Sequence, residues 1–341
     1  MNSRERVFTA LERKRPDRVP IHASFVPQLE KKLEEYFNLK GPELYIELGN
    51  DLLLTAFIGV ADGFYKKELE TYQDDWGITW KWINNYTEPY IHPLSKDDLV
   101  YSFNTPDPLT HRGYKEAIDL ISKYGKKYVI VGCVDCSIFE AAWYLRGLNQ
   151  VLIDFYENKD LINILLDKTM NFTLQAGLRY IELGVDIIRT GDDFGTQEGM
   201  IISPSTWREF FKERYANLFS NFKKKNPYIK IAYHSCGNII PIIPDLIEIG
   251  LDILNPIQPR AMNPSELKKK FGNNLSFWGG IDIQYTLPFG TKQEIKDEVK
   301  LRISQLDGDG GLILSPAHNI QYDTPIENVS AFYEEAKRCE S

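Results

Sequence analysis

The chain has 341 residues, of which 43% are hydrophobic, 26% are charged and 13% are aromatic. This composition is typical of a globular protein and excludes collagen-like repeats, coiled coils and wholly disordered chains. With 40 Lys and Arg residues against 48 Asp and Glu residues, the formal net charge is −8, which argues against a broadly basic surface that binds nucleic acid.

Short apolar runs alternate with helical patterns along the chain. Residues 2–13 predict a first helix, because Asn2 and Glu5 have the spacing of a capping box. The predicted strands cover residues 18–23, 51–57, 127–135, 185–193, 229–234, 251–255, 275–281 and 311–315. Continuous rather than alternating apolar residues are expected of parallel strands that are covered on both faces. The sequence therefore predicts an α/β protein with one (β/α)8 TIM-barrel domain over residues 1–341. A doubly wound open sheet is the alternative, but the glycine-rich phosphate loop expected after the first strand of that fold is absent from this sequence.

Two long stretches interrupt this alternation. Residues 62–107 follow the second predicted strand, and we expect them to form a lid beside the barrel mouth, because loops after barrel strands tolerate insertions. Their Trp76, Trp80 and Trp82 either line the pocket of a flat ligand or form the small core of a hairpin, which is the more frequent arrangement. Residues 137–183 follow the third strand and have a mostly helical pattern.

The cysteine content and the N-terminus indicate a reducing compartment. Four cysteines are too few for a disulfide scaffold in a chain of this length. No apolar segment follows the charged residues 1–6, so we expect no signal peptide. The most apolar stretch, residues 52–61, is well short of the ~20 residues that span a bilayer. We expect a cytoplasmic protein that does not enter a membrane.

Polar side chains follow most of the predicted strands. In a barrel the carboxyl ends of the strands meet on one face, where the active site lies. The polar residues at these ends are His22, Asp135, Asp192, Asp193, Gln197, His234, Cys236, Asn255, Gln258, Asp282 and His318. Because three of the chain's five histidines are among them, the pattern favours a site at this face.

The sharpest local pattern is His234-x-Cys236, after the fifth strand. Imidazole and thiolate are ligands that suit Zn²⁺, and a catalytic zinc needs about three protein ligands and one open position. His318, after the last strand, is the candidate third ligand, since both strands end on the same face. The alternative is that Cys236 is an inert core thiol and His234 a polar residue with an ordinary hydrogen bond.

Carboxylates at neighbouring strand ends are candidates for a fourth ligand or for a group that orients the ligands. These are Asp135, Asp192 and Asp193. Because adjacent residues usually point to opposite sides, at most one of Asp192 and Asp193 faces the barrel mouth. Cys133 and Cys136 form a C-x-x-C pattern, but there is no second pair to complete a structural zinc site.

Several segments together resemble the uroporphyrinogen decarboxylase superfamily. They are residues 3–7 (SRERV), 15–20 (RPDRVP), 75–77 (DWG), 202–204 (ISP), 234–237 (HSCG), 279–282 (GGID) and 324–328 (TPIEN). The resemblance covers nearly the whole chain, and it implies a (β/α)8 barrel with a deep cleft at its C-terminal face.

The resemblance is closer to one branch of this superfamily than to the other. True uroporphyrinogen decarboxylases carry an arginine-rich segment soon after the first strand, which grips the propionates of the substrate, whereas residues 21–27 here contain no arginine. Cobalamin-dependent methyltransferases of the corrinoid/coenzyme M type carry the His-x-Cys zinc pair and a later cysteine. In this chain His318 stands in place of that cysteine, which would make the metal more Lewis acidic.

The resemblance implies a zinc-dependent methyltransferase that moves a methyl group between a corrinoid protein and a small thiol, hydroxyl or methoxy compound. His234, Cys236 and His318 would hold Zn²⁺, with Asp193 as a fourth ligand or a catalytic carboxylate beside it. The polar groups expected to orient substrate are Gln197, Asn255, Gln258 and Asp282. The methylcorrinoid would come with the partner protein. Two alternatives stay open: a decarboxylase of a porphyrinogen or related carboxylic acid, and a noncatalytic binder of a tetrapyrrole or corrinoid.

Overall fold

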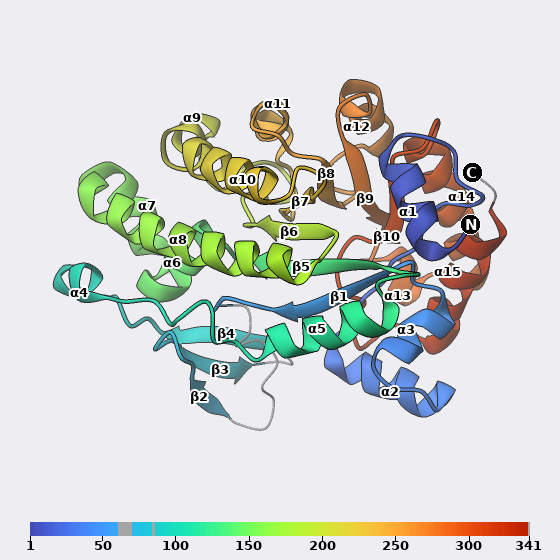
Figure 1. Cartoon of the computed structure of the whole chain (residues 1–341), viewed down its shortest axis with the longest axis horizontal. Coiled ribbons are helices and arrows are strands. Elements are labelled where there is room, and N and C mark those ends of the chain that lie inside the picture. The colour runs from blue at the N-terminus through green and yellow to red at the C-terminus, as the bar shows by residue number, and fades with distance from the viewer. Residues whose placement is uncertain (61–69, 84–85, 340–341) are drawn as a thin grey trace.

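The computed structural model describes residues 1–60, 70–83 and 86–339, and its centre is a curled sheet of seven parallel strands flanked by helices (Figure 1). The strand order is β1-β5-β6-β7-β8-β9-β10, and every neighbouring pair is parallel. The strands are β1 (Leu52–Phe57), β5 (Val129–Asp135), β6 (Ile187–Gly191), β7 (Lys230–His234), β8 (Ile253–Ile257), β9 (Ser276–Ile281) and β10 (Leu312–Pro316). Seven of the eight predicted strands are thus confirmed, within an α/β fold that resembles a TIM barrel.

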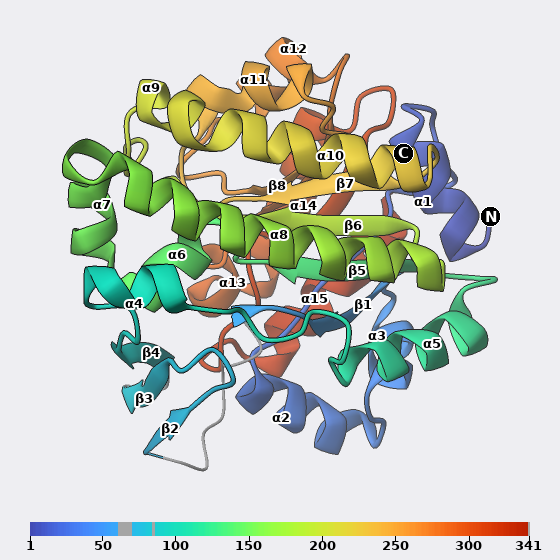
Figure 2. The same ribbon diagram turned by 60° about the vertical axis from the view of Figure 1, so that its left-hand side comes forward.

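Helices between the strands surround the sheet, as Figure 2 shows for α8 and α10. They are α1 (Ser3–Leu11), α2 (Pro27–Phe37), α3 (Pro42–Leu48), α4 (Asp97–Ser102), α5 (Gly113–Tyr124), α6 (Phe139–Arg146), α7 (Leu148–Glu157), α8 (Lys159–Leu183), α9 (Pro204–Trp207), α10 (Glu213–Lys225), α11 (Ile243–Glu248), α12 (Pro264–Phe271), α13 (Thr286–Phe289), α14 (Lys292–Leu306) and α15 (Ile326–Arg338). A π-helical turn, Arg208–Lys212, joins α9 to α10, and a 3-10 turn, Ile240–Ile242, precedes α11. The capping box that Asn2 and Glu5 predict is present at the start of α1.

The prediction of a full strand over residues 18–23 is wrong. This segment makes a single parallel bridge, between Ile21 and Leu314 of β10, and not a continuous ladder. One physical reason is Pro20, whose ring nitrogen has no hydrogen to donate to a ladder. Its carbonyl still accepts from the N–H of Leu314, at 2.8 Å. The sheet therefore has seven regular strands, with this segment beside β10.

Side chains replace much of the backbone ladder between this segment and β1. The amide of Asn50 accepts from the N–H of Ala23 at 3.0 Å and donates to the carbonyl of Ala23 at 2.8 Å. Asp51, which is fully buried, accepts from the N–H of Ile21 at 2.8 Å and pairs with Arg6 at 2.7 Å. Polar side chains therefore attach the segment at the start of β1, where the sequence predicted strand pairing.

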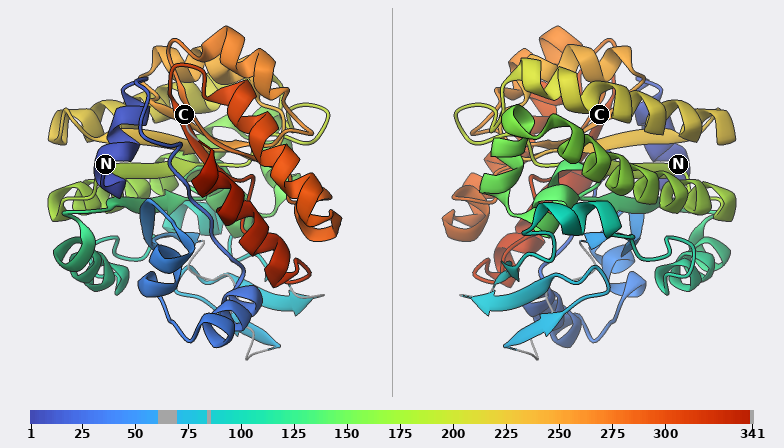
Figure 3. Two further views of the ribbon diagram at one scale, coloured as in Figure 1. Left: turned by 90° about the vertical axis from the view of Figure 1, so that its right-hand side faces the viewer. Right: turned by 90° about the vertical axis from the view of Figure 1, so that its left-hand side faces the viewer.

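The stretch after β1 contains a small antiparallel sheet of β2 (Thr71–Gln73), β3 (Thr79–Ile83) and β4 (Tyr86–Ile91), which lies at one end of the molecule (Figure 3). Trp80 is fully buried and packs against Tyr144 of α6, and Trp76 packs against Phe172 of α8. These two tryptophans are thus part of the packing between this small sheet and the helices. Residues 61–69 of the predicted lid lie outside the described residues, and its action as a lid stays a prediction.

The second interruption, after β5, is helical as predicted and forms α6, α7 and α8. The longest of these, α8, has 25 residues, and its buried positions include Leu165, Thr169 and Phe172. No helix within the described part of the chain is long and apolar enough to cross a membrane.

Candidate metal centre

The three predicted metal ligands come from the carboxyl ends of two strands. His234 is the last residue of β7, Cys236 follows two residues later, and His318 lies two residues beyond β10. Gly237 lies in a tight turn directly after Cys236, where the backbone passes close to Gly195. A side chain would not fit there, since a Cβ atom at this position would lie 2.2 Å from the carbonyl carbon of Gly195. Glycine at this position thus allows the turn that carries the cysteine.

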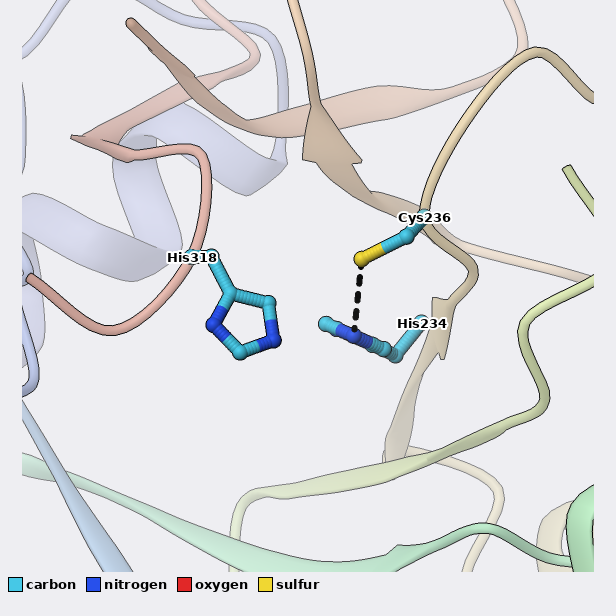
Figure 4. Close-up of side chains that lie close together, drawn as sticks. All are labelled: His234, Cys236 and His318. Carbon is cyan, nitrogen blue, oxygen red and sulfur yellow. Dashed lines mark hydrogen bonds between the residues drawn. The ribbon is translucent and has the colours of Figure 1, made fainter. Parts of the chain in front are cut away.

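The donor atoms of His234, Cys236 and His318 all lie within 4.8 Å of one another, and within residues 1–60, 70–83 and 86–339 this is the group of three side chains that could hold a metal ion. The sulfur of Cys236 is 3.7 Å from Nε2 of His234. Figure 4 shows His318 approaching the His234–Cys236 pair from the opposite side. Two imidazole nitrogens and one thiol sulfur are a donor set that suits zinc.

Asn255 of β8 orients the imidazole of His234. Its Nδ2 donates to the carbonyl of Trp278 at 3.2 Å, so its Oδ1 is free to accept. Nδ1 of His234 lies 2.7 Å from this Oδ1 and therefore carries the ring hydrogen. The lone pair of Nε2 is then left for a metal, on the side where Cys236 lies. A ligating histidine fixed in this way by its other nitrogen is a recurrent feature of metal sites.

Asp193, two residues beyond β6, lies beside the same group. Its Oδ1 accepts from the N–H of Cys236 at 2.7 Å and is 3.8 Å from Nε2 of His234. Its neighbour Asp192 is buried and accepts from the N–H groups of Ile138, Phe139 and Glu140 at the start of α6. As predicted for an adjacent pair, only one of the two carboxylates faces the site.

Burial sets the protonation of the donors. Burial, and then the neighbouring His234, lower the pKa of His318 to about 4, so the imidazole of His318 is neutral at neutral pH. Burial and the carboxyl groups of Asp193 and Glu140 raise the pKa of the Cys236 thiol well above its usual value. Neutral imidazole is the form that binds a metal, whereas the thiol must lose its proton when it does so.

Two of the three donors, His234 and His318, line a cavity of about 480 Å³, a size that suits a small molecule. Its wall includes the predicted residues His234, His318, Asp193, Asn255, His22 and Asp135. On this wall Arg189 of β6 forms an ion pair with Asp135 at 2.8 Å and lies against the rings of Phe57 and Trp278. The cavity therefore holds one guanidinium, already paired with a carboxylate.

The structure does not place the other predicted substrate-binding residues on this wall. Gln197 is exposed, and Gln258 accepts from the N–H of Gly237 at 2.7 Å, which supports the turn after Cys236. Asp282 is buried and pairs with Arg260 at 2.9 Å. Asn255 does lie on the wall, where it contacts His234.

Sequence reasoning missed Glu140 and Tyr144 of α6, which also line the cavity. The hydroxyl of Tyr144 donates to Glu140 at 3.2 Å, and Glu140 accepts from the N–H of Asp193 at 3.0 Å. Burial and the neighbouring Asp193 and Asp192 raise the pKa of Glu140 well above its usual value. No strand end precedes these residues directly, and the contact that places their helix, between its first turn and the distant Asp192, has no local sequence signal.

A protein-family model described as "Uroporphyrinogen decarboxylase (URO-D)" matches residues 65–339 of the chain. Among curated proteins, uroporphyrinogen decarboxylase from Nostoc punctiforme is 23% identical over 257 residues, which cover 73% of this chain and 70% of that protein. Methylated-thiol–coenzyme M methyltransferase from Methanosarcina mazei is 22% identical over 203 residues, 58% of this chain and half of that protein.

Among solved structures, a methyltransferase from Methanosarcina mazei superimposes with a TM-score of 0.78 over 99% of both chains, at 21% sequence identity. At this identity the likeness shows that the two proteins share a fold.

Proposed function

This chain belongs to the uroporphyrinogen decarboxylase family, and we propose that it is a zinc-dependent methyltransferase. It would move a methyl group between a corrinoid protein and a small thiol, hydroxyl or methoxy compound. The observation that carries the proposal is the convergence of His234, Cys236 and His318, whose donor atoms lie within 4.8 Å of one another, with both histidines on a cavity wall.

The chemistry of the donors supports zinc. Catalytic zinc sites have three protein ligands of nitrogen, sulfur or oxygen and leave a position open for substrate. Here His234 and His318 line the cavity, and the hydrogen bond from Nδ1 to Asn255 leaves Nε2 of His234 free to bind a metal. When bound, the metal would lower the pKa of a substrate thiol or hydroxyl and so provide the nucleophile or stabilise the leaving group.

The protein's own groups have separate tasks in this proposal. Cys236 gives up its proton on metal binding, and Asp193 lies 3.8 Å from Nε2 of His234, where its carboxylate can approach as a fourth ligand or take a proton from substrate. Burial raises the pKa of Glu140, which favours its neutral form, and in that form it could donate a hydrogen bond to substrate on the same wall.

The identity of the third ligand, His318, affects which class of substrate the metal would favour. It takes the place that a cysteine holds in the methyltransferases that the sequence resembles. A neutral imidazole gives less charge to the metal than a thiolate does, so the metal would be more Lewis acidic. This favours a substrate that binds through oxygen, such as a methoxy or hydroxy compound, over a thiol.

The methylcorrinoid partner follows from the proposed reaction. The donors lie at the carboxyl ends of β7 and β10, so the corrinoid would have to approach this end of the barrel. We propose that a corrinoid-binding protein docks there. The similarity to the Methanosarcina coenzyme M methyltransferase supports this choice of partner class.

Decarboxylation of a porphyrinogen is the second candidate, and the buried Arg189 on the cavity wall is the observation that favours it. Against it, Arg189 is already paired with Asp135, and no arginine lies in residues 21–27. Hydrogen bonds to charged groups are worth roughly 1.5–3 kcal/mol, so a substrate with several carboxylates would lose several powers of ten in affinity without such partners.

Two assays on one preparation separate the candidates. The zinc-loaded protein is incubated with methylcobalamin and a panel of thiols and alcohols, and cleavage of the cobalt–methyl bond is followed by absorbance. We expect transfer to at least one acceptor and its loss in Cys236→Ala. In parallel, anaerobic uroporphyrinogen is supplied and coproporphyrinogen is measured; turnover at the rate of a true decarboxylase would overturn the proposal.

A further inference from the structure

A second cavity, of about 730 Å³, lies beside the metal cavity and is bounded by β1 and by residues of α2, α3 and α5. In Figure 1 these helices lie together on the β1 side of the sheet. Five residues line both cavities: His22, Ser24, Ala56, Phe57 and Asn319. The two cavities therefore meet between β1 and the segment that forms only one bridge to β10.

The two cavities differ in how exposed their lining residues are. The residues that line the metal cavity are buried or half-buried. The second cavity has an exposed outer rim, which includes Glu43, Glu116, Asp119 and Lys123, and its inner wall includes the buried Leu52 and Leu53. It thus runs from the surface on the side of the barrel to the wall of the metal cavity.

His22 marks the junction and points to a ligand. Its side chain is 4% exposed and belongs to the walls of both cavities, with the ring edge against Trp278. Its Nδ1 has no hydrogen-bond partner within the described residues. Because a buried polar atom without a partner is costly, a polar group that passes or rests here would satisfy it.

The rim of the second cavity is acidic, whereas its interior is mostly apolar. Three exposed carboxyl groups, those of Glu43, Glu116 and Asp119, lie at the rim together with one lysine, Lys123. Lys123 is itself paired with Glu43, at 2.5 Å. Between the rim and the junction the wall consists largely of Leu52, Leu53, Leu54, Phe25 and Leu120. Such a path attracts cations at its entrance and repels anions.

We propose that the small-molecule substrate reaches the metal centre through this second cavity, from the side of the barrel, and that the acidic rim admits neutral and cationic molecules in preference to anions. That this substrate takes part in methyl transfer rests on the proposed function. With a corrinoid protein docked at the carboxyl ends of the strands, a side entrance leaves the substrate a path of its own. Both reactants can then be present at the centre together.

The test uses the thiol of Cys236 as a reporter, so it requires neither zinc nor methyl transfer. The sulfur of Cys236 lies 3.7 Å from Nε2 of His234, and His234 lines the metal cavity. The metal-free protein is treated with thiosulfonate reagents of similar size that are neutral, cationic or anionic, and modification of Cys236 is timed by peptide mass spectrometry. Leu120 of α5 lines the second cavity only, so Leu120→Trp narrows the path away from the metal cavity. Ile118→Trp, on the same helix but 47% exposed and outside the cavity wall, is the matched control.

We expect Leu120→Trp to slow the modification of Cys236 by at least about tenfold, because close-packed walls leave little room for a detour, and Ile118→Trp to leave it unchanged. An unchanged rate in folded Leu120→Trp would show that small molecules enter elsewhere and would overturn the proposal. Since the readout is independent of zinc, a protein that fails to transfer methyl groups can still pass or fail this test.

The charge preference is tested at exposed residues, where folding is not at risk. The double variant Glu116→Gln/Asp119→Asn removes two rim charges. In the unaltered protein we expect the cationic reagent to modify Cys236 about tenfold faster than the anionic one, within the range of electrostatic steering. The ratio should fall toward one in the double variant. Because both rates depend on the same thiolate, their ratio is independent of the fraction of Cys236 that is ionised. An equal ratio in the double variant and the unaltered protein would contradict the proposal that the rim selects by charge.

Discussion

The two sides of the barrel are built differently. On the β7–β10 side, four parallel strands pair in order, with one register shift between β8 and β9, and the candidate ligands His234 and His318 and the supporting Asn255 lie on or shortly after these strands. On the β1 side, one bridge and the side chains of Asn50 and Asp51 take the place of a ladder, and a second cavity is present. Strand pairing on the β7–β10 side fixes the positions of the candidate ligands. The missing strand pairing on the β1 side leaves room for the second cavity, which meets the metal cavity.

The largest effect is expected on the β1 side, at Asp51. Asp51→Ala removes the buried carboxylate that pairs with Arg6 and Arg18 and accepts from the N–H of Ile21. Breaking a buried charge pair from one side costs about 3–5 kcal/mol, so we expect the free energy of unfolding to fall by that amount. Urea denaturation measures this loss, and a loss below about 1 kcal/mol would show that the attachment of residues 18–23 does not depend on Asp51.

Asp192 and Asp193 provide the next comparison, between a carboxylate that holds the fold and one that faces the cavity. Asp192→Ala leaves three backbone N–H groups at the start of α6 and the hydroxyl of Tyr215 without their partner. We expect a loss of about 3 kcal/mol in stability, since each unsatisfied buried group costs about 1–3 kcal/mol and the chain relaxes. Thermal or urea denaturation is the measurement.

Asp193→Ala is the matched control for this prediction. Asp193 is only half-buried and accepts one backbone hydrogen bond, from Cys236. It should therefore lose less stability than Asp192→Ala but more metal affinity. The reverse order of the two variants in stability would contradict the assignment of these neighbours.

On the β7–β10 side, Asn255 should affect metal affinity more than stability. Asn255→Ala removes the acceptor that fixes the tautomer of His234. Loss of such a supporting hydrogen bond typically lowers metal affinity by about 10–100-fold. Competition with a zinc chelator measures this change. Asn274→Ala, at an exposed position, is the control and should bind zinc as the unaltered protein does.

A smaller effect is expected from the titration of His22 at the junction of the two cavities. Burial, and then the charge of Arg189, lower the pKa of His22 to about 3 from the usual value of 6.5. A group whose folded pKa is lowered contributes stability that is present above pH 6.5 and is lost as the pH falls toward 3. The slope is at most about 1.4 kcal/mol per pH unit.

His22→Phe keeps an aromatic ring against Trp278 and removes the titrating group. Compared with this variant, the unaltered protein should lose stability faster between neutral pH and about pH 5 in urea denaturation. Parallel pH profiles for the two proteins would show that His22 is not a neutral, buried group.

Periodicity predicted the regular half of the molecule well, because parallel strands covered on both faces need continuous apolar runs such as residues 127–135. It failed at residues 18–23, where the run is apolar enough for a strand. There Pro20 and the polar side chains of Asn50 and Asp51, distant in sequence, decide the pairing. Local patterns do not contain such long-range hydrogen bonds.

The candidate site was predicted only where residues directly follow strands. The grouping of His234, Cys236 and His318 could be predicted because strand ends in a barrel share one face. Glu140 and Tyr144 could not, because they lie on a helix whose position depends on the contact of its first turn with Asp192. Gln197 and Asp282 have the right chemistry near strand ends, but short turns carry their side chains away from the cavity.

The most direct test of the account is the metal content and coordination of the purified protein, with all thiols reduced at neutral pH. Elemental analysis and X-ray absorption should find about one zinc per chain, with nitrogen ligands at about 2.0–2.1 Å and one sulfur ligand at about 2.3 Å. Cys236→Ala should lose the sulfur signal together with most of the metal, and His318→Ala should lose most of the metal. A protein that binds no zinc under these conditions, or binds it without sulfur, would contradict the central claim.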